Sequence, residues 1–155
     1  MKAKIHAAAG AFALLTVSGF WLSTVLAELF GDGAAIDMVK AGILNGMIVL
    51  IPAMAVAGAS GFWLSKGWKS PAVLRKKQRM RIIAANGLLV LLPSAFFLAG
   101  RAGAGLFDST FLIVQAIELA AGAVNIALLS LNMRDGLSLR RKAAPDSRPA
   151  RNLAA

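Results

Sequence analysis

The sequence predicts an all-α integral membrane protein, a four-transmembrane-helix bundle with both termini in the cytoplasm. Four apolar stretches reach the length of about 20 residues that a helix needs to span a bilayer. Hydrophobic residues make up 58% of the 155 residues and charged residues 15%, whereas soluble domains carry about 25% charged residues. The basic residues stand beside the apolar stretches, where they act as an orientation signal.

The first apolar stretch covers residues 5–30 and follows Lys2 and Lys4. A basic start before an apolar run also describes a secretory signal peptide, and residues 25–27 would suit cleavage. The run is longer than the usual apolar region of about 7–15 residues in such peptides. We therefore expect a retained membrane helix, with a cleaved signal peptide as the alternative.

The second stretch covers residues 37–64 and contains Pro52 and many small residues. Gly42 and Gly46 form a GxxxG pattern, which lets two membrane helices approach closely. The pattern predicts a helix-packing contact, although glycine is also common in membrane helices without such a role.

The third stretch covers residues 82–100 and follows a basic segment, which we interpret as a loop. Ser70 and Pro71 are expected to start a short helical turn at the membrane interface within it. Such a cluster fixes orientation and attracts anionic lipid headgroups. The residues assigned to this contact are Arg75, Lys76, Lys77, Arg79 and Arg81.

The fourth stretch covers residues 109–133 and completes a predicted membrane domain over residues 1–134. A basic, proline-containing segment follows over residues 135–155. Its lack of apolar periodicity predicts a disordered cytoplasmic tail.

The distribution of charge predicts the orientation. Of the 17 Lys and Arg residues, only Lys40 and Arg101 fall near the first and third links between the spans. By the positive-inside rule the termini and the central segment are cytoplasmic, which suits a bacterial-type inner membrane. The net charge of +10 therefore indicates contact with anionic headgroups rather than nucleic acid.

A polar seam runs along the fourth apolar stretch. Its members are spaced by three, four, three and seven residues, which keeps them on one face of a helix. Polar groups in a membrane helix face protein or a water-filled cavity. The polar seam consists of Gln115, Glu118, Gly122, Asn125 and Asn132.

Counting residues from the helix ends predicts two polar layers. Glu118 is placed at the level of Asn45, and Asn125 at the level of Asn86. We interpret the asparagines as interhelical hydrogen-bonding groups, worth about 0.6–2 kcal/mol each.

Glu118 has two interpretations, because an ionisable group inside a membrane span is a functional candidate by default. It is either structural, neutral or paired with Lys40 or Arg101, or functional, in proton coupling, ion coupling or substrate binding.

A single b-type haem is a further hypothesis, since histidine and methionine are common axial ligands. His6, Met80 and Met133 are predicted near the same membrane face. The simpler interpretation places His6 among headgroups and expects no cofactor. With no cysteine and one histidine, thiolate and multi-histidine metal sites are excluded.

Three functions follow from these features, and an enzyme is not favoured. The first is a non-catalytic accessory or assembly subunit of a larger membrane complex. The second is a proton-coupled carrier that uses Glu118 and works as a homo-oligomer, and the third is an electron-transfer protein with haem on His6. A soluble enzyme, a nucleic-acid binder and a thiol oxidoreductase are excluded.

Overall fold

The computed structural model describes residues 2–64, 66–67 and 71–142, and its regular elements in these ranges are all helices. Four of its spans, residues 4–30, 33–64, 73–103 and 109–138, are long and apolar enough to cross a membrane. The predicted all-helical architecture is therefore confirmed, with four helices long and apolar enough to span a membrane. The elements are α1 (Lys2–Phe30), α2 (Gly33–Leu64), α3 (Pro71–Asn86), the π-helical turn η1 (Gly87–Leu91), α4 (Leu92–Gly103) and α5 (Ser109–Lys142).

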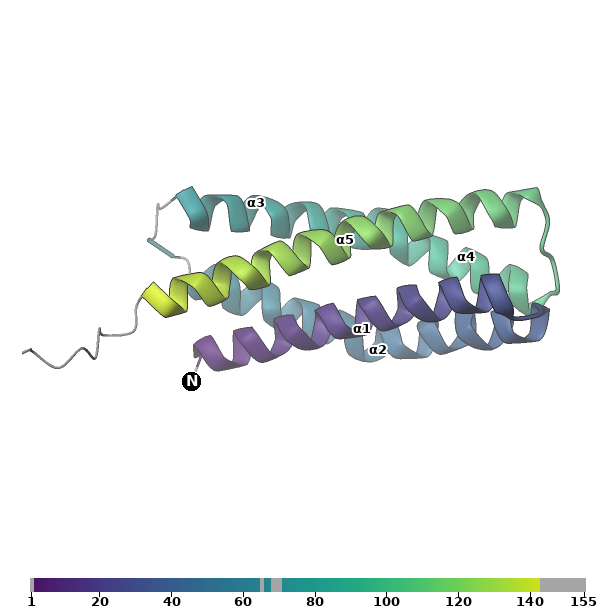
Figure 1. The fold of residues 1–155 in the computed structure, drawn as a ribbon, viewed down its shortest axis with the longest axis horizontal. Helices are drawn as coiled ribbons and strands as arrows, with labels where there is room; N and C mark the ends of the chain where they lie inside the picture. Colours follow the sequence, from purple (N-terminus) through teal and green to yellow (C-terminus); the bar gives the residue numbers. More distant parts are fainter. Residues whose placement is uncertain (1, 65, 68–70, 143–155) are drawn as a thin grey trace, which may run out of the picture.

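The helices lie along one long axis and return the chain to the same end after every second span (Figure 1). α1 packs against α2 and α5, α3 packs against α5, and α4 packs against both α2 and α5. A cluster of buried apolar residues joins α4 to α5 through Leu98, Ala102 and Phe111. Many large apolar side chains point outward instead, among them Leu15 and Ile48. An apolar exterior of this kind suits a bundle whose solvent is lipid.

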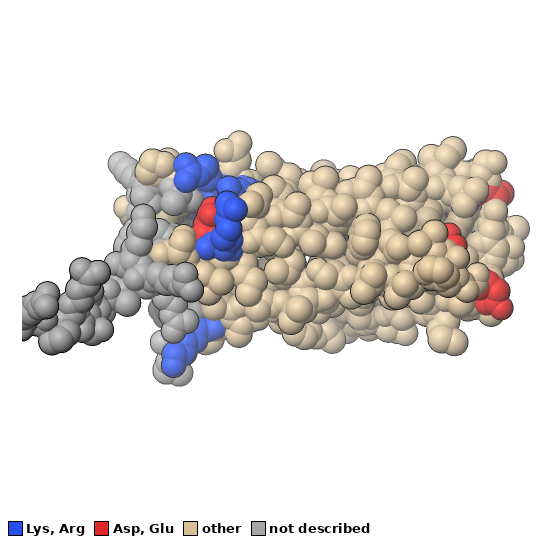
Figure 2. All heavy atoms as spheres, viewed as in Figure 1, with Lys and Arg blue, Asp and Glu red and all other residues tan. Residues whose placement is uncertain are grey.

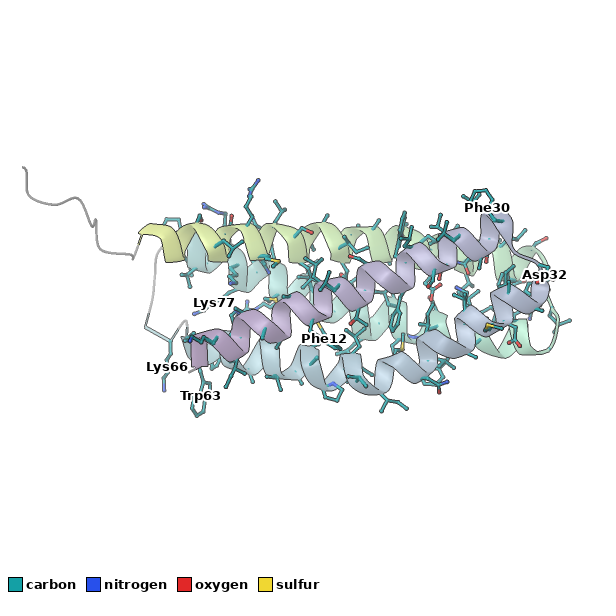
Figure 3. All side chains as sticks on the ribbon, turned by 60° about the horizontal axis from the view of Figure 1, so that its bottom comes forward. Phe12, Phe30, Asp32, Trp63, Lys66 and Lys77 are labelled. Atoms are coloured by element: carbon teal, nitrogen blue, oxygen red, sulfur yellow. The ribbon has the colours of Figure 1, made fainter. Side chains whose placement is uncertain are left out.

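Charges separate along the long axis, with Lys and Arg at one end and most Asp and Glu toward the other (Figure 2). We name the two ends the basic end and the acidic end. Trp63 and Lys66 lie at the basic end, whereas Phe30 and Asp32 lie at the acidic end (Figure 3). The basic end also holds Arg75, Lys76, Lys77, Arg79, Arg81 and Arg134, and the acidic end holds Asp37 and Asp108.

Aspartates start the two helices that leave the acidic end. Asp32 Oδ1 accepts a hydrogen bond of 2.9 Å from the Ala35 amide, and Asp108 Oδ1 accepts one of 3.0 Å from the Phe111 amide. Both are N-caps, which satisfy amide groups that have no partner within the helix. The cap at Asp32 explains why α2 begins at Gly33, four residues earlier than the expected start at residue 37.

The basic segment is helical from Pro71 onward, which corrects the sequence-based boundary at residue 82. α3 begins at Pro71, and proline is well suited to the first position of a helix because its missing amide is not needed there. α5 correspondingly continues to Lys142, so the predicted tail is wrong for residues 135–142. Arg79 in α3 and Asp135 in α5 form an ion pair of 2.7 Å that links the two extensions. Residues 143–155 of the predicted tail lie outside the described residues.

The third span changes its winding in the middle. η1 is a π-helical turn in which the Leu92 amide donates to the Gly87 carbonyl. Pro93 follows directly, and a proline removes the amide that would bond four residues back while its ring crowds that carbonyl. A wider π turn before the proline relieves this conflict.

The GxxxG pattern is used at one of its two glycines. A Cβ at Gly46 would collide with the Phe20 ring, so this glycine allows α1 and α2 to pack closely. Gly42 is exposed, and a Cβ there would meet nothing within 4 Å. The predicted packing contact therefore involves Gly46, while Gly42 belongs to the open surface of α2.

Candidate functional site

An ion pair lies inside the bundle toward the acidic end. Lys40 Nζ in α2 lies 2.6 Å from Glu118 Oε2 in α5, and the two side chains are 1% and 11% exposed. Lys40 is thus among the largest fully buried side chains of the described residues. Of the two partners that the sequence offered to Glu118, the structure selects Lys40. Arg101 instead pairs with Asp108 in the link before α5.

Gln115 adds an amide to this pair. Its Nε2 lies 3.4 Å from Glu118 Oε2, one turn away along α5. The side chain is 4% exposed, and its Oε1 is buried without a hydrogen-bond partner among the described residues. The Gln115 amide therefore contacts Glu118 through Nε2, while its Oε1 remains a buried hydrogen-bond acceptor without a partner in the described chain.

Glu28 brings a second carboxyl group to the same place, and the sequence analysis missed it. It is half-buried in the last turn of α1, close enough to interact electrostatically with Lys40 and Glu118. Its Oε1 is buried and, within the described part of the chain, has no hydrogen-bond partner. A carboxyl group near the end of a membrane span resembles an ordinary interfacial residue, so only the packing of α1 reveals its neighbours.

These four residues, Glu28, Lys40, Gln115 and Glu118, are named the charged cluster. They come from three helices, so the cluster depends on the assembled bundle. A buried ion pair costs several kcal/mol per ion in desolvation, which attraction and further hydrogen bonds offset. When its three ionisable groups are charged, the cluster holds two negative charges and one positive charge. It therefore combines a fixed ion pair with one additional carboxyl group.

Asn45 does not join this layer, which corrects the expected level with Glu118. Its side chain is exposed on the outside of α2. Lys40 occupies the inner position instead, and five residues on an α-helix correspond to a rotation of about 140°. The two side chains consequently point to different sides of α2. Counting residues gives only the position of Asn45 along the helix axis. Asn45 was placed beside Glu118 because that count ignores the rotation of its side chain about the axis.

Asn86 and Asn125 form a polar layer near the middle of the bundle. Asn86 Nδ2 lies 2.9 Å from both Asn125 Oδ1 and the Ala121 carbonyl. Asn125 Nδ2 points to the Ile83 carbonyl at 3.5 Å. The contacts join α3 to α5 beside the π turn, at the same level that the sequence suggested.

The last member of the polar seam has no such partner. Asn132 is 4% exposed, and both of its amide atoms are buried without a hydrogen bond within the described ranges. Gly122 serves packing: a Cβ there would lie 2.9 Å from Trp21 Cδ1. Trp21 Nε1 donates to the Leu119 carbonyl at 2.9 Å, so α1 is fastened to α5 at this point.

His6 is packed against α2. Its Nδ1 lies 3.0 Å from the Ala57 carbonyl and 3.1 Å from Ser60 Oγ. A Cβ at Gly61 would lie 2.9 Å from the ring, so the imidazole lies directly on the α2 backbone. Met80 is half-buried and Met133 is 41% exposed on the surface of α5. His6 therefore fastens α1 to α2.

Among residues 2–64, 66–67 and 71–142 there is no group of three or more His, Cys, Asp or Glu residues that could hold a metal ion. No family model matches the chain, and neither the curated proteins nor the solved structures contain a significant match.

Proposed function

We propose that this protein is a non-catalytic accessory or assembly subunit of a larger membrane complex. It binds another membrane protein through the exposed stripe of α2 that includes Asn45. We name this stripe the Asn45 face, and its residues are Met38, Gly42, Asn45, Val49, Pro52 and Val56, all of them exposed.

The exposed amide of Asn45 is the observation that carries this proposal. α2 has 32 residues, and at 1.5 Å per residue Asn45 lies about 5 Å from its midpoint. Moving an amide from water to a medium without hydrogen bonds costs about 4–8 kcal/mol. A polar side chain facing outward at this depth is favoured when a neighbouring protein supplies a hydrogen bond.

The surroundings of Asn45 suit a helix of another protein. Gly42 lies one turn away on the same stripe and is open, so a partner backbone can approach closely there. Inside the bundle, by contrast, Lys40 is paired with Glu118 and Asn86 with Asn125. These polar groups have partners within the bundle, whereas Asn45 faces outward. This difference supports a role of Asn45 in association.

Purification in a mild detergent tests the proposal by mass and by protein composition. We expect a complex with a second membrane protein in stoichiometric amount, and Asn45→Leu should reduce recovery of that partner at least several-fold. Val124→Leu is the matched control, since it places the same side chain on an exposed position of α5. A solitary monomer, a complex of this chain with itself alone, or a partner retained equally by Asn45→Leu would contradict the proposal.

We further propose that the basic end faces the cytoplasm of a bacterial-type cell and contacts anionic headgroups. The separation of basic and acidic side chains along the bundle supports this orientation (Figure 2). Trp63 at the basic end is 68% exposed and suits a position in the headgroup region.

A proton-coupled carrier is the second candidate function. The observation in its favour is that ionisable groups from α1, α2 and α5 meet inside the bundle. Four spans rarely enclose a pathway, so this candidate requires an oligomer. Proton-driven transport in proteoliposomes that disappears in Glu118→Gln would support it. Transport unaffected by that substitution would exclude Glu118 as the coupling residue.

A further inference from the structure

We propose that the charged cluster is a proton-binding site in which Glu28, rather than Glu118, carries the exchangeable proton. The inference does not depend on association through the Asn45 face, because the cluster is formed by the single chain.

Glu118 is already paired with Lys40. Glu118 Oε2 accepts from Lys40 Nζ at 2.6 Å and lies 3.4 Å from Gln115 Nε2. Adding a proton to Glu118 would remove the negative charge that balances Lys40, and a buried charge without a partner is strongly destabilising. Glu118 is therefore already held by an ion pair and a nearby amide.

Within the described chain, Glu28 forms no such ion pair. Its Oε1 is buried and without a hydrogen-bond partner in the described chain, although Lys40 lies within electrostatic range. The elements packed against α1 are α2 and α5, and the charged groups that they direct toward Glu28 are Lys40 and Glu118. Glu118 and Glu28 therefore share the single ammonium group, and Glu118 is the one that forms an ion pair with it.

One proton added to Glu28 changes both the net charge and the hydrogen bonding of the charged cluster. It cancels the excess negative charge of the cluster, and it turns Glu28 from a pure acceptor into a hydrogen-bond donor. Gln115 supplies an independent indication that a donor is needed, because its buried Oε1 is an acceptor without a partner. The proton comes from water at the acidic end and returns there, so no bond other than O–H forms or breaks.

A metal cation fits the cluster less well than a proton. Hard cations such as Ca²⁺ and Mg²⁺ take about six or more oxygen ligands. The unpartnered buried oxygens of the charged cluster are Glu28 Oε1 and Gln115 Oε1. The Lys40 ammonium group beside them would also repel a cation. These features favour a proton.

Infrared difference spectroscopy of the protein in lipid nanodiscs, recorded across a pH titration, tests this inference. Exposed carboxyl groups are ionised above about pH 6, so the titration covers about pH 6 to 9. In this range we expect wild type to show the carbonyl band of a protonated carboxylic acid that appears and disappears with pH. Glu28→Gln should abolish the band, while Glu28→Asp should retain it at a shifted frequency. Asp32→Asn, an exposed substitution at the same end, is the control and should leave it unchanged.

Size-exclusion profiles and melting curves identify variants that fail to fold, and the wild-type spectrum is decisive without any variant. A wild type with no titrating carboxylic acid band would overturn the inference. A band that persists unchanged in folded Glu28→Gln would overturn it as well, by assigning the proton to another residue. Either result leaves association through the Asn45 face unaffected.

Discussion

Lys40 and Glu118 are the residues whose separate removal should cost the most stability. Removing one partner of a buried ion pair costs about 3–5 kcal/mol, because the other charge remains buried without compensation. We expect Lys40→Met and Glu118→Leu each to lower the free energy of unfolding by about that amount. The double variant should recover most of the loss, since it buries neither charge.

Reversible unfolding in mixed detergent micelles measures all four members of this double-mutant cycle. Asn86→Leu is a useful reference, because its hydrogen bonds are worth about 0.6–2 kcal/mol by comparison with other membrane helices. Losses that simply add in the Lys40→Met/Glu118→Leu variant would show that the two groups do not form a coupled pair.

Single residues also show what the sequence could predict about the site. The helical spacing of α5 identified Gln115, Glu118 and Asn125 as members of one face, because that spacing depends on one element alone. Three other features depend on the rotation of each helix about its own axis. They are the pairing of Glu118 with Lys40, the position of Glu28 beside this pair and the outward position of Asn45. That rotation is determined by packing between helices, which one sequence does not specify.

At the scale of the helix, Gly42 and Gly46 offer a matched pair of substitutions. Gly46→Ala should destabilise the α1–α2 contact by about 1–3 kcal/mol, because its Cβ would enter the space of the Phe20 ring. Gly42→Ala should leave stability unchanged or slightly raised, since its Cβ meets nothing within 4 Å. Thermal unfolding of the two variants gives the comparison, and equal effects would contradict the assigned packing of α1 on α2.

The helix boundaries show which local signals were sufficient. α5 begins at the predicted residue because Asp108 caps a helix that turns apolar at once. The start of α3 was misplaced because seven basic residues between positions 66 and 81 resemble a loop in a membrane protein. The contact of α3 with α5, including the ion pair of Arg79 with Asp135, stabilises the helix from Pro71 onward. A contact between segments more than 50 residues apart gives no local signal.

At the scale of the whole molecule, the separation of charge predicts one orientation. A cysteine introduced at Phe107, in the link before α5, should react with a membrane-impermeant maleimide in intact cells. A cysteine introduced at Lys66, which is exposed at the basic end, should react only after the cells are opened (Figure 3). The reverse pattern would contradict the proposed cytoplasmic position of the basic end.

The whole-molecule architecture was the part that the sequence predicted best. Hydropathy over spans of about 20 residues is a property of composition, and the bilayer imposes helices on such spans. Four spans and their order along the chain follow from that constraint alone. The surface on which a partner would bind does not, because it depends on which residues the packed bundle leaves outside.

The most direct test of the central claim is photo-crosslinking from position 45 in the native membrane. A photoreactive amino acid at Asn45 should yield an adduct with a second membrane protein, and positions 42 and 49 on the same face should yield the same adduct. Positions 117 and 124, which are exposed on α5, should yield none. Association through the Asn45 face predicts this periodic pattern. No adduct from position 45, or adducts of equal yield from both helices, would contradict it.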